Sequence, residues 1–244
     1  MPLRRIGGDA EGYYKLCFDI IAVPTIGGDP VKTWMYPNHQ GPNPETLWTE
    51  LHEARVYLYS FNRRQDSKHE GITTYAEDLL QAIRSEVIDL GRRPLHFAAF
   101  STGGLVVKRA LLLALGGFDK GRYLCITRSC FSLAFFGTPH YGSNFLSLSA
   151  YKEGVKELFG LTYPYSSRLR REIRKIKNLD EMQQFDELFI PSTLSLAKIW
   201  SFVEVKETKL RVPIVDDGKQ GEMFVRVPVS TPQSTDMPIP LRPK

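Results

Sequence analysis

Residues 94–108 read PLHFAAFSTGGLVVK, and this stretch decides the fold that we expect for the chain. Residues 95–100 are apolar and β-rich, whereas residues 104–115 have the composition of a helix. Ser101 lies between them, at a sharp turn from strand to helix. Small residues, Ala99 and Gly103, flank the serine, because such a turn brings the strand and helix backbones close together. The pattern predicts a serine hydroxyl held at the end of a strand.

This layout is that of a nucleophile elbow, G-x-S-x-G, with Ala99 in place of the first glycine. The elbow exposes a serine Oγ and places the next backbone N–H, that of Thr102, where an oxyanion would form. A serine hydroxyl becomes a nucleophile only beside a base. In the order typical of this motif, an acid and then a histidine follow the serine, but the only histidine after Ser101 is His140. The sequence therefore predicts a nucleophile without a base in the usual place.

His140 has two interpretations. It could substitute as the base for Ser101, or it could shape the loop 137–143 that follows the apolar stretch 131–136. We favour the second, because a base must come within hydrogen-bond reach of the hydroxyl. The other histidines are expected to be packed in a strand (His96) or solvated (His39, His52 and His69).

Composition places the chain among globular proteins. It has 244 residues, of which 42% are hydrophobic and 24% charged, with a formal net charge of +5 at pH 7. This length suits one large α/β domain, and the mild positive charge by itself does not indicate nucleic-acid binding. Cys17, Cys125 and Cys130 have no metal or redox spacing and suit a reducing compartment. With no membrane-spanning run and no secretory signal, we expect an intracellular, cytoplasmic protein.

Strands and helices are expected to alternate along the first 140 residues. Apolar runs predict strands at 16–23, 55–61, 95–100 and 131–136, with helices at 73–90 and 104–115. Thr73 or Thr74 would cap the first helix and Gly91 would end it. Such alternation favours a parallel sheet with helices on both faces, whose ligand sites lie beyond the carboxyl ends of the strands. That rule places the loop after Val23, the Ser101 turn and the loop after residue 136 on one rim.

The sequence pattern of the second half of the chain predicts a helical cap, further β-structure and a tail. Residues 166–189 are helical, with Leu169, Ile173 and Ile176 at helical spacing among basic residues. The basic residues are either the solvated face of this helix, which we favour, or a lid or membrane-surface patch. Residues 199–205 and 224–229 are β-like. We expect a single domain over 1–229, with the cap at about 145–195, and a proline-rich, disordered tail at 230–244.

Three motifs together resemble one family. They are VPTIGGDPVKTW at 23–34, FSTGGLVVK at 100–108 and FFGTPHYGS at 135–143. They are similar to the lipase-like serine esterase domain of the α/β-hydrolase superfamily, which fungi carry at the N-terminus of large NACHT, ankyrin or tetratricopeptide proteins. The resemblance covers residues 15 to 215. It departs at Pro24 and Thr25, where the family has His and Gly, and at Tyr141, where it has Arg.

The resemblance implies an α/β-hydrolase fold and a set of site residues. The loop after Val23 would supply a second oxyanion N–H near Thr25 and Ile26, beside that of Thr102. The family's acid would fall near residues 199–205 or just after. The matching carboxylates are Glu204, Asp216 and Asp217. The family's histidine would lie where this chain enters its proline-rich tail. No cofactor or metal is expected.

Two functions therefore compete. The first is a serine ester hydrolase acting on acyl-ester or lipid substrates, which requires His140 or a histidine beyond Lys244 in a longer natural chain with additional domains. The second is a catalytically inactive hydrolase module for protein interaction or signalling, which Pro24, Thr25 and the missing histidine favour. A nucleic-acid binder is a weaker third option, because no aromatic and basic motif accompanies the charge, so no nucleic-acid partner is expected.

Overall fold

The computed structural model describes residues 2–6, 17–35, 48, 51–62, 71–87, 89–140, 142–147, 152–176, 197–203, 208–213 and 220–225. The strands are β1 (Leu3–Arg5), β2 (Phe18–Val23), β3 (Ala54–Tyr59), β4 (Leu95–Phe100), β5 (Cys130–Phe136), β6 (Lys198–Phe202), β7 (Thr208–Pro213) and β8 (Gln220–Val225). The α-helices are α1 (Ile72–Glu86), α2 (Thr102–Leu115), α3 (Leu124–Ser129), α4 (Asn144–Ser147), α5 (Lys152–Leu158) and α6 (Ser167–Lys175). Two 3-10 turns are η1 (Lys32–Trp34) and η2 (Phe118–Gly121).

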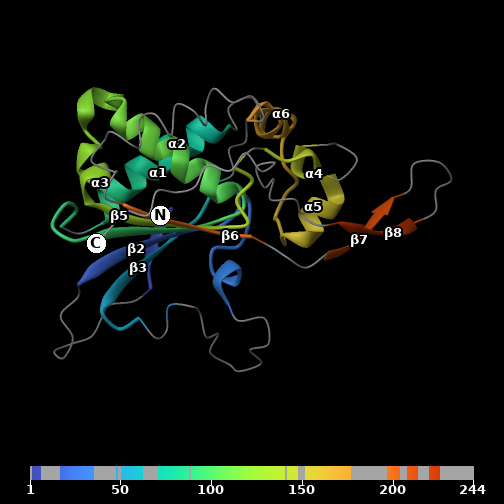
Figure 1. The fold of residues 1–244 in the computed structure, drawn as a ribbon, viewed down its shortest axis with the longest axis horizontal. Helices are drawn as coiled ribbons and strands as arrows, with labels where there is room; N and C mark the ends of the chain where they lie inside the picture. Colours follow the sequence, from blue (N-terminus) through green and yellow to red (C-terminus); the bar gives the residue numbers. More distant parts are fainter. Residues whose placement is uncertain are drawn as a thin grey trace, which may run out of the picture.

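One mostly parallel sheet organises the molecule (Figure 1). Its order is β1-β3-β2-β4-β5-β6, and only the β1–β3 pair is antiparallel. Register pairs Val23 with Ala99 and Phe100 with Phe136, so the carboxyl ends of β2, β4 and β5 meet at one edge. The expected α/β class, its four main strands and their common rim are therefore confirmed. Strands β7 and β8 form a separate two-stranded ladder.

Helices α1, α2 and α3 cover one face of the sheet, as Figure 1 shows above β2–β5. Their apolar side chains join the inward residues of β2, β3, β4 and β5 in the main core. A second, smaller core lies on the other face, where Trp34 of η1 packs on Ala22, Val56 and Ala98. Strand β3 is buried along its whole length, as expected for a parallel strand covered on both faces.

The ends of α1 differ from the prediction. Gly71, and neither Thr73 nor Thr74, precedes the helix, and its cap position makes no side-chain hydrogen bond. Instead the Ile72 N–H donates to Oε2 of Glu172 in α6, at 2.7 Å. A carboxylate suits a helix N-terminus because the unpaired N–H groups there carry partial positive charge. The helix also stops at Glu86, well before Gly91, so both capping predictions were wrong.

Helix α6 has the two faces that the sequence predicted. Leu169, Ile173 and Ile176 are buried in the main core, with Ile173 fully inaccessible. Arg171 and Lys175 are exposed. Ser166 caps the helix by accepting a hydrogen bond from the Leu169 N–H at 3.1 Å. The apolar stripe on α6, together with the Glu172 carboxylate that caps α1, therefore attaches this helix to the domain.

We expect Ile173→Val to lower the stability of the domain more than the removal of two charges from α6. The lost methyl group of a buried isoleucine costs about 1 kcal/mol, which lowers the Tm by about 2–4 °C in a chain of this size. The double variant Arg171→Ala/Lys175→Ala should stay within about 1 °C of the wild type, because exposed charges contribute little. Thermal unfolding followed by circular dichroism checks both. A larger loss of Tm in the double variant than in Ile173→Val would mean that the basic face of α6 is covered by another part of the protein and not by solvent.

Several predictions lie outside the described residues. They include Glu204, Asp216 and Asp217, the cap residues 177–195 and the tail at 230–244. The helices α4, α5 and α6 fall within the range expected for the cap and group together at one end of the sheet in Figure 1. Among the described residues, no helix has the length and apolar character needed to cross a membrane.

Candidate functional site

Ser101 occupies the turn between β4 and α2, so the predicted strand–turn–helix layout is confirmed. Its backbone has φ 51° and ψ −125°, a conformation that residues other than glycine rarely adopt. The Ser101 N–H donates to the Phe136 carbonyl at the end of β5, at 2.8 Å. Its Oγ is buried and has no hydrogen-bond partner among the described residues. The turn thus holds a strained serine whose hydroxyl makes no hydrogen bond within the described part of the chain.

The two glycines after the serine allow the start of α2 to approach its neighbours. A Cβ on Gly103 would lie 2.1 Å from the Pro24 carbonyl oxygen and 2.9 Å from that of Val23. A Cβ on Gly104 would lie 2.1 Å from Thr138 Oγ1. Only hydrogen fits at these two positions, so the glycines bring α2 against the loops that follow β2 and β5. The three rim segments predicted from the sequence are therefore in direct contact.

A buried polar cluster lies beside Ser101. It joins Thr25, Thr102 and Tyr165, whose hydroxyl oxygens are 2.9 Å (Thr25–Thr102), 2.7 Å (Thr25–Tyr165) and 3.1 Å (Thr102–Tyr165) apart. The Ile26 N–H donates to Thr102 Oγ1 at 3.0 Å. Burial raises the pKa of Tyr165 to about 12, which keeps its hydroxyl neutral. The Ile26 N–H, expected from the resemblance to face an oxyanion, is thus already paired with a neighbouring side chain.

His140 lies on the loop after β5, and no hydrogen bond joins it to Ser101 within the described part of the chain. Its Nε2 is 3.3 Å from Ser201 Oγ of β6, and its ring packs edge-on against Phe135. Its Nδ1 is buried without a hydrogen-bond partner in the described part of the chain. Burial, together with the nearby charge of Lys108, lowers its pKa to about 3. His140 is therefore neutral at pH 7 and weakly basic. Its pKa lies far below the value near 7 that suits a general base.

Lys108 and Tyr165 are the residues of this region that the sequence did not single out. The Nζ atom of Lys108, in α2, lies over the Phe135 ring, 5.8 Å from its centroid. Phe135 belongs to β5, the strand that leads to His140. A lysine among the apolar residues of α2, at helical spacing from Leu105 and Leu111, was a readable signal of a buried charge. Tyr165 left no such signal, because its partners Thr25 and Thr102 are far away in the sequence.

A pocket of about 290 Å³ lies on the same rim as Ser101. Phe100, the residue before Ser101, forms part of its wall and packs edge-on against Phe159. Its other lining residues are Leu158, Gly160, Asp29, Lys32 and Thr33. The pocket is mixed, with apolar walls from β4 and the residues around the end of α5 and polar groups from the loop after β2.

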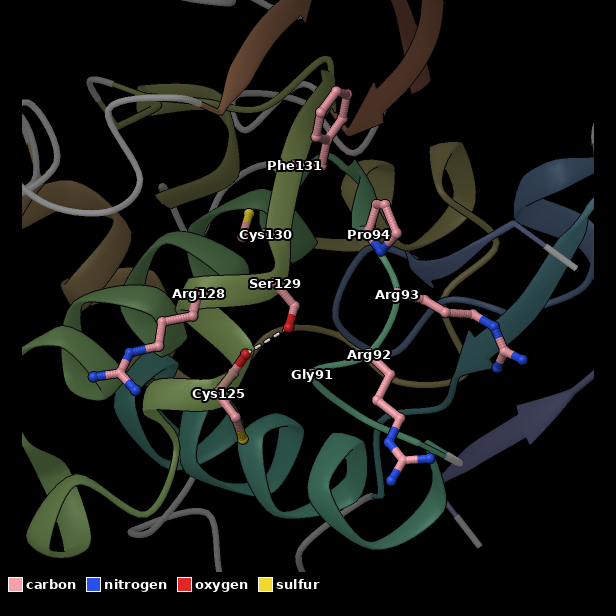
Figure 2. A pocket seen from close by; sticks show the side chains of 9 residues that line it. All are labelled: Gly91, Arg92, Arg93, Pro94, Cys125, Arg128, Ser129, Cys130 and Phe131. Atoms are coloured by element: carbon pink, nitrogen blue, oxygen red, sulfur yellow. Dashed lines mark hydrogen bonds between the residues drawn. The ribbon is translucent and has the colours of Figure 1, made fainter.

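A larger pocket lies at the opposite, amino-terminal ends of the strands (Figure 2). It encloses about 600 Å³ where β4 and β5 begin, between Pro94 and Phe131. Three arginines line it, but Figure 2 shows that the side chains of Arg92, Arg93 and Arg128 point away from one another. They do not converge on a ligand, and the pocket lies far from the Ser101 rim. Within the described residues, no group of His, Cys, Asp or Glu could hold a metal ion.

Comparison with solved structures identifies the fold. The mature lipase BlEst2 of Bacillus licheniformis superposes with a TM-score of 0.53 at 13% identity, over 84% of this chain and 73% of the lipase. This chain has an α/β-hydrolase fold. The phospholipase PlaB of Legionella pneumophila is also similar, with a TM-score of 0.51 at 15% identity, over 76% of this chain and 38% of PlaB. No family model matches the chain, and neither does any curated protein sequence.

Proposed function

We propose that this chain is a serine-hydrolase domain that binds acyl esters, with Ser101 as the nucleophile at a nucleophile elbow. The observation that carries the proposal is the backbone of Ser101. A serine at φ 51° and ψ −125° is strained by about 1–3 kcal/mol, and such strain collects at active sites, where it is part of the mechanism. The unpaired Oγ and the two obligatory glycines support the same role, since an elbow needs a free hydroxyl and close backbones.

The oxyanion of the reaction would form beside the N-terminus of α2. The Thr102 N–H is the first donor, because it follows the nucleophile in the turn. An N–H of the Thr25–Ile26 loop is the proposed second donor, because the Ile26 N–H lies beside Thr102 at the start of α2. Phe100, Leu158 and Phe159 would hold the apolar part of an ester substrate, a lipid among the candidates.

The triad is the incomplete part of the proposed site. His140 is paired with Ser201 and weakly basic, so we assign it to loop structure and not to proton transfer. Glu204 and Asp216 remain proposed acids without a histidine to orient. We therefore propose that this chain alone turns esters over slowly. We also propose that the protein is cytoplasmic and that a longer natural chain of the fungal multidomain type supplies the base.

A catalytically inactive module is the second candidate, and one specific observation favours it. The Ile26 N–H, which an oxyanion would need, is occupied by Thr102 Oγ1. An inactive module would keep the strained turn as an inherited feature and use its surface for protein interaction or signalling. The two candidates differ in whether Ser101 reacts at all.

Labelling by a fluorophosphonate separates them. We expect slow labelling, over hours, that mass spectrometry maps to Ser101 and that Ser101→Ala abolishes. Turnover of short p-nitrophenyl esters should lie within about tenfold of Ser101→Ala, because an enzyme lacking a triad member keeps only modest catalysis. No labelling at high probe concentration would reject Ser101 as a nucleophile and favour the inactive module. Fast, Ser101-dependent turnover would contradict the missing base, and loss of labelling in His140→Ala would then identify His140 as that base.

A further inference from the structure

The Thr102 hydroxyl accepts a hydrogen bond from the Ile26 N–H, the group proposed above as an oxyanion donor. The N–H to Oγ1 distance of 3.0 Å is that of an ordinary hydrogen bond, and Thr102 itself is fully buried. An oxyanion hole presents its N–H groups to a carbonyl oxygen that enters from outside. Here the same N–H is satisfied from within, by the side chain of the residue that follows Ser101.

Two other hydroxyls hold Thr102 in this position. The oxygens of Thr102, Thr25 and Tyr165 form a triangle in which each hydroxyl can donate once and accept once. The Thr102 oxygen keeps a second lone pair for the Ile26 N–H. All three residues are buried, so water does not compete for these bonds. We call this set of three hydroxyls the latch.

Tyr165 belongs to the segment that enters α6, and this segment also closes over the loop after β2. The Thr162 N–H donates to the Gly27 carbonyl at 3.0 Å. The Tyr163 ring lies against Gly27, within 3.5 Å of where a Cβ would be. Ser101, the neighbour of Thr102 in the chain, is only 2% exposed. Residues 161–166 therefore form a strap across the oxyanion loop, and the latch fastens the strap to Thr102.

We propose that the Thr102 hydroxyl is an internal ligand of the Ile26 N–H, held by Thr25 and Tyr165, and that an acyl ester binds at Ser101 only after this latch opens. The inference rests on the proposed function and makes Thr102 a positioning residue for it. The competition is direct, because an N–H that already donates to Thr102 cannot stabilise the carbonyl oxygen of a substrate. The latch adds a second reason, besides the missing base, for slow turnover.

Hydrogen exchange at the Ile26 amide tests the latch without any chemistry at Ser101. We expect this amide to exchange at least about tenfold faster in Thr102→Ala than in the wild type, since its acceptor is gone. Thr102→Ser keeps a hydroxyl at the same place and should leave the Ile26 amide protected. Equal protection of the Ile26 amide in all three proteins would overturn the latch, because Thr102 would then not be its partner.

Fluorophosphonate labelling of the same variants tests the consequence. Thr102→Ala should label at Ser101 about tenfold faster than the wild type. Tyr165→Phe, which removes one hydroxyl of the latch and leaves Thr102 intact, should label faster than the wild type but by a smaller factor. Faster Ile26 exchange with no labelling of any variant would support the latch and reject Ser101 as a nucleophile. Unchanged labelling in Thr102→Ala, with the wild type reactive, would overturn the latch as a barrier to substrate.

Discussion

Replacing Gly103 by alanine should destabilise the domain by about 3 kcal/mol or more, even though alanine is the better helix former. The added Cβ would lie 2.1 Å from the Pro24 carbonyl oxygen and 2.9 Å from that of Val23. Both atoms belong to the backbone at the end of β2, so no side-chain rotation relieves the contact. The start of α2 would have to move away from the sheet, taking the Ser101 turn with it.

Urea unfolding measures the loss, and the sign of the result is decisive. Without the clash, glycine to alanine in a helix would stabilise the domain by about 1 kcal/mol. Gly116→Ala is a matched control at the other end of α2, where φ is −70° and the nearest atom is the Leu112 carbonyl oxygen at 3.3 Å. We expect the control to change stability by no more than about 1 kcal/mol. A stabilised Gly103→Ala would mean that α2 does not approach β2 so closely.

Gly104 offers a comparison within the same turn. Its added Cβ would meet the side chain of Thr138, at 2.1 Å from Oγ1 and 2.6 Å from Cγ2, and not the backbone. Because Thr138→Ala removes both of these atoms, it should recover part of the stability lost in Gly104→Ala. No single side-chain change offers the same relief to Gly103→Ala. The two glycines thus separate a backbone constraint from a side-chain constraint at one site.

The sequence was sufficient where the signal is local. The apolar run before Ser101, the small residues around it and the glycines after it predict the strand, turn and helix, because each is a short-range steric requirement. The buried face of α6 was also readable, since Leu169, Ile173 and Ile176 recur at helical spacing.

The sequence was insufficient where partners are distant in the chain. Glu172 caps α1 across 100 residues, and no rule of local capping predicts it. Tyr165 reaches Thr25 across 140 residues for the same reason. The resemblance placed an oxyanion donor near Ile26, but whether that N–H is free depends on a side-chain rotamer of Thr102, which only packing decides. The arrangement of side chains at this site is therefore determined by contacts that local patterns do not encode.

Asp19 and Arg55 form a buried ion pair within the sheet. The two residues are opposite one another in the β2–β3 register, and their side chains are 3% and 4% exposed. Two parallel hydrogen bonds join them, from Arg55 Nε to Oδ1 at 2.5 Å and from Nη2 to Oδ2 at 2.7 Å. The hydrogen bond to Asp19 raises the pKa of Arg55. A charge here is buried away from water, which disfavours the charged form unless it is paired.

We expect Asp19→Leu and Arg55→Met each to cost about 3–5 kcal/mol, and the double variant to cost much less than the sum. Each single change removes one partner of the buried pair and leaves the other charge in place, whereas the double change leaves apolar side chains of similar volume. Urea unfolding of the four proteins gives the coupling free energy, provided that the m-value stays constant. Single variants that each cost under about 1 kcal/mol would show that water reaches this face of the sheet. Additive losses in the double variant would show that packing around β2 and β3, and not the charge pair, determines the stability there.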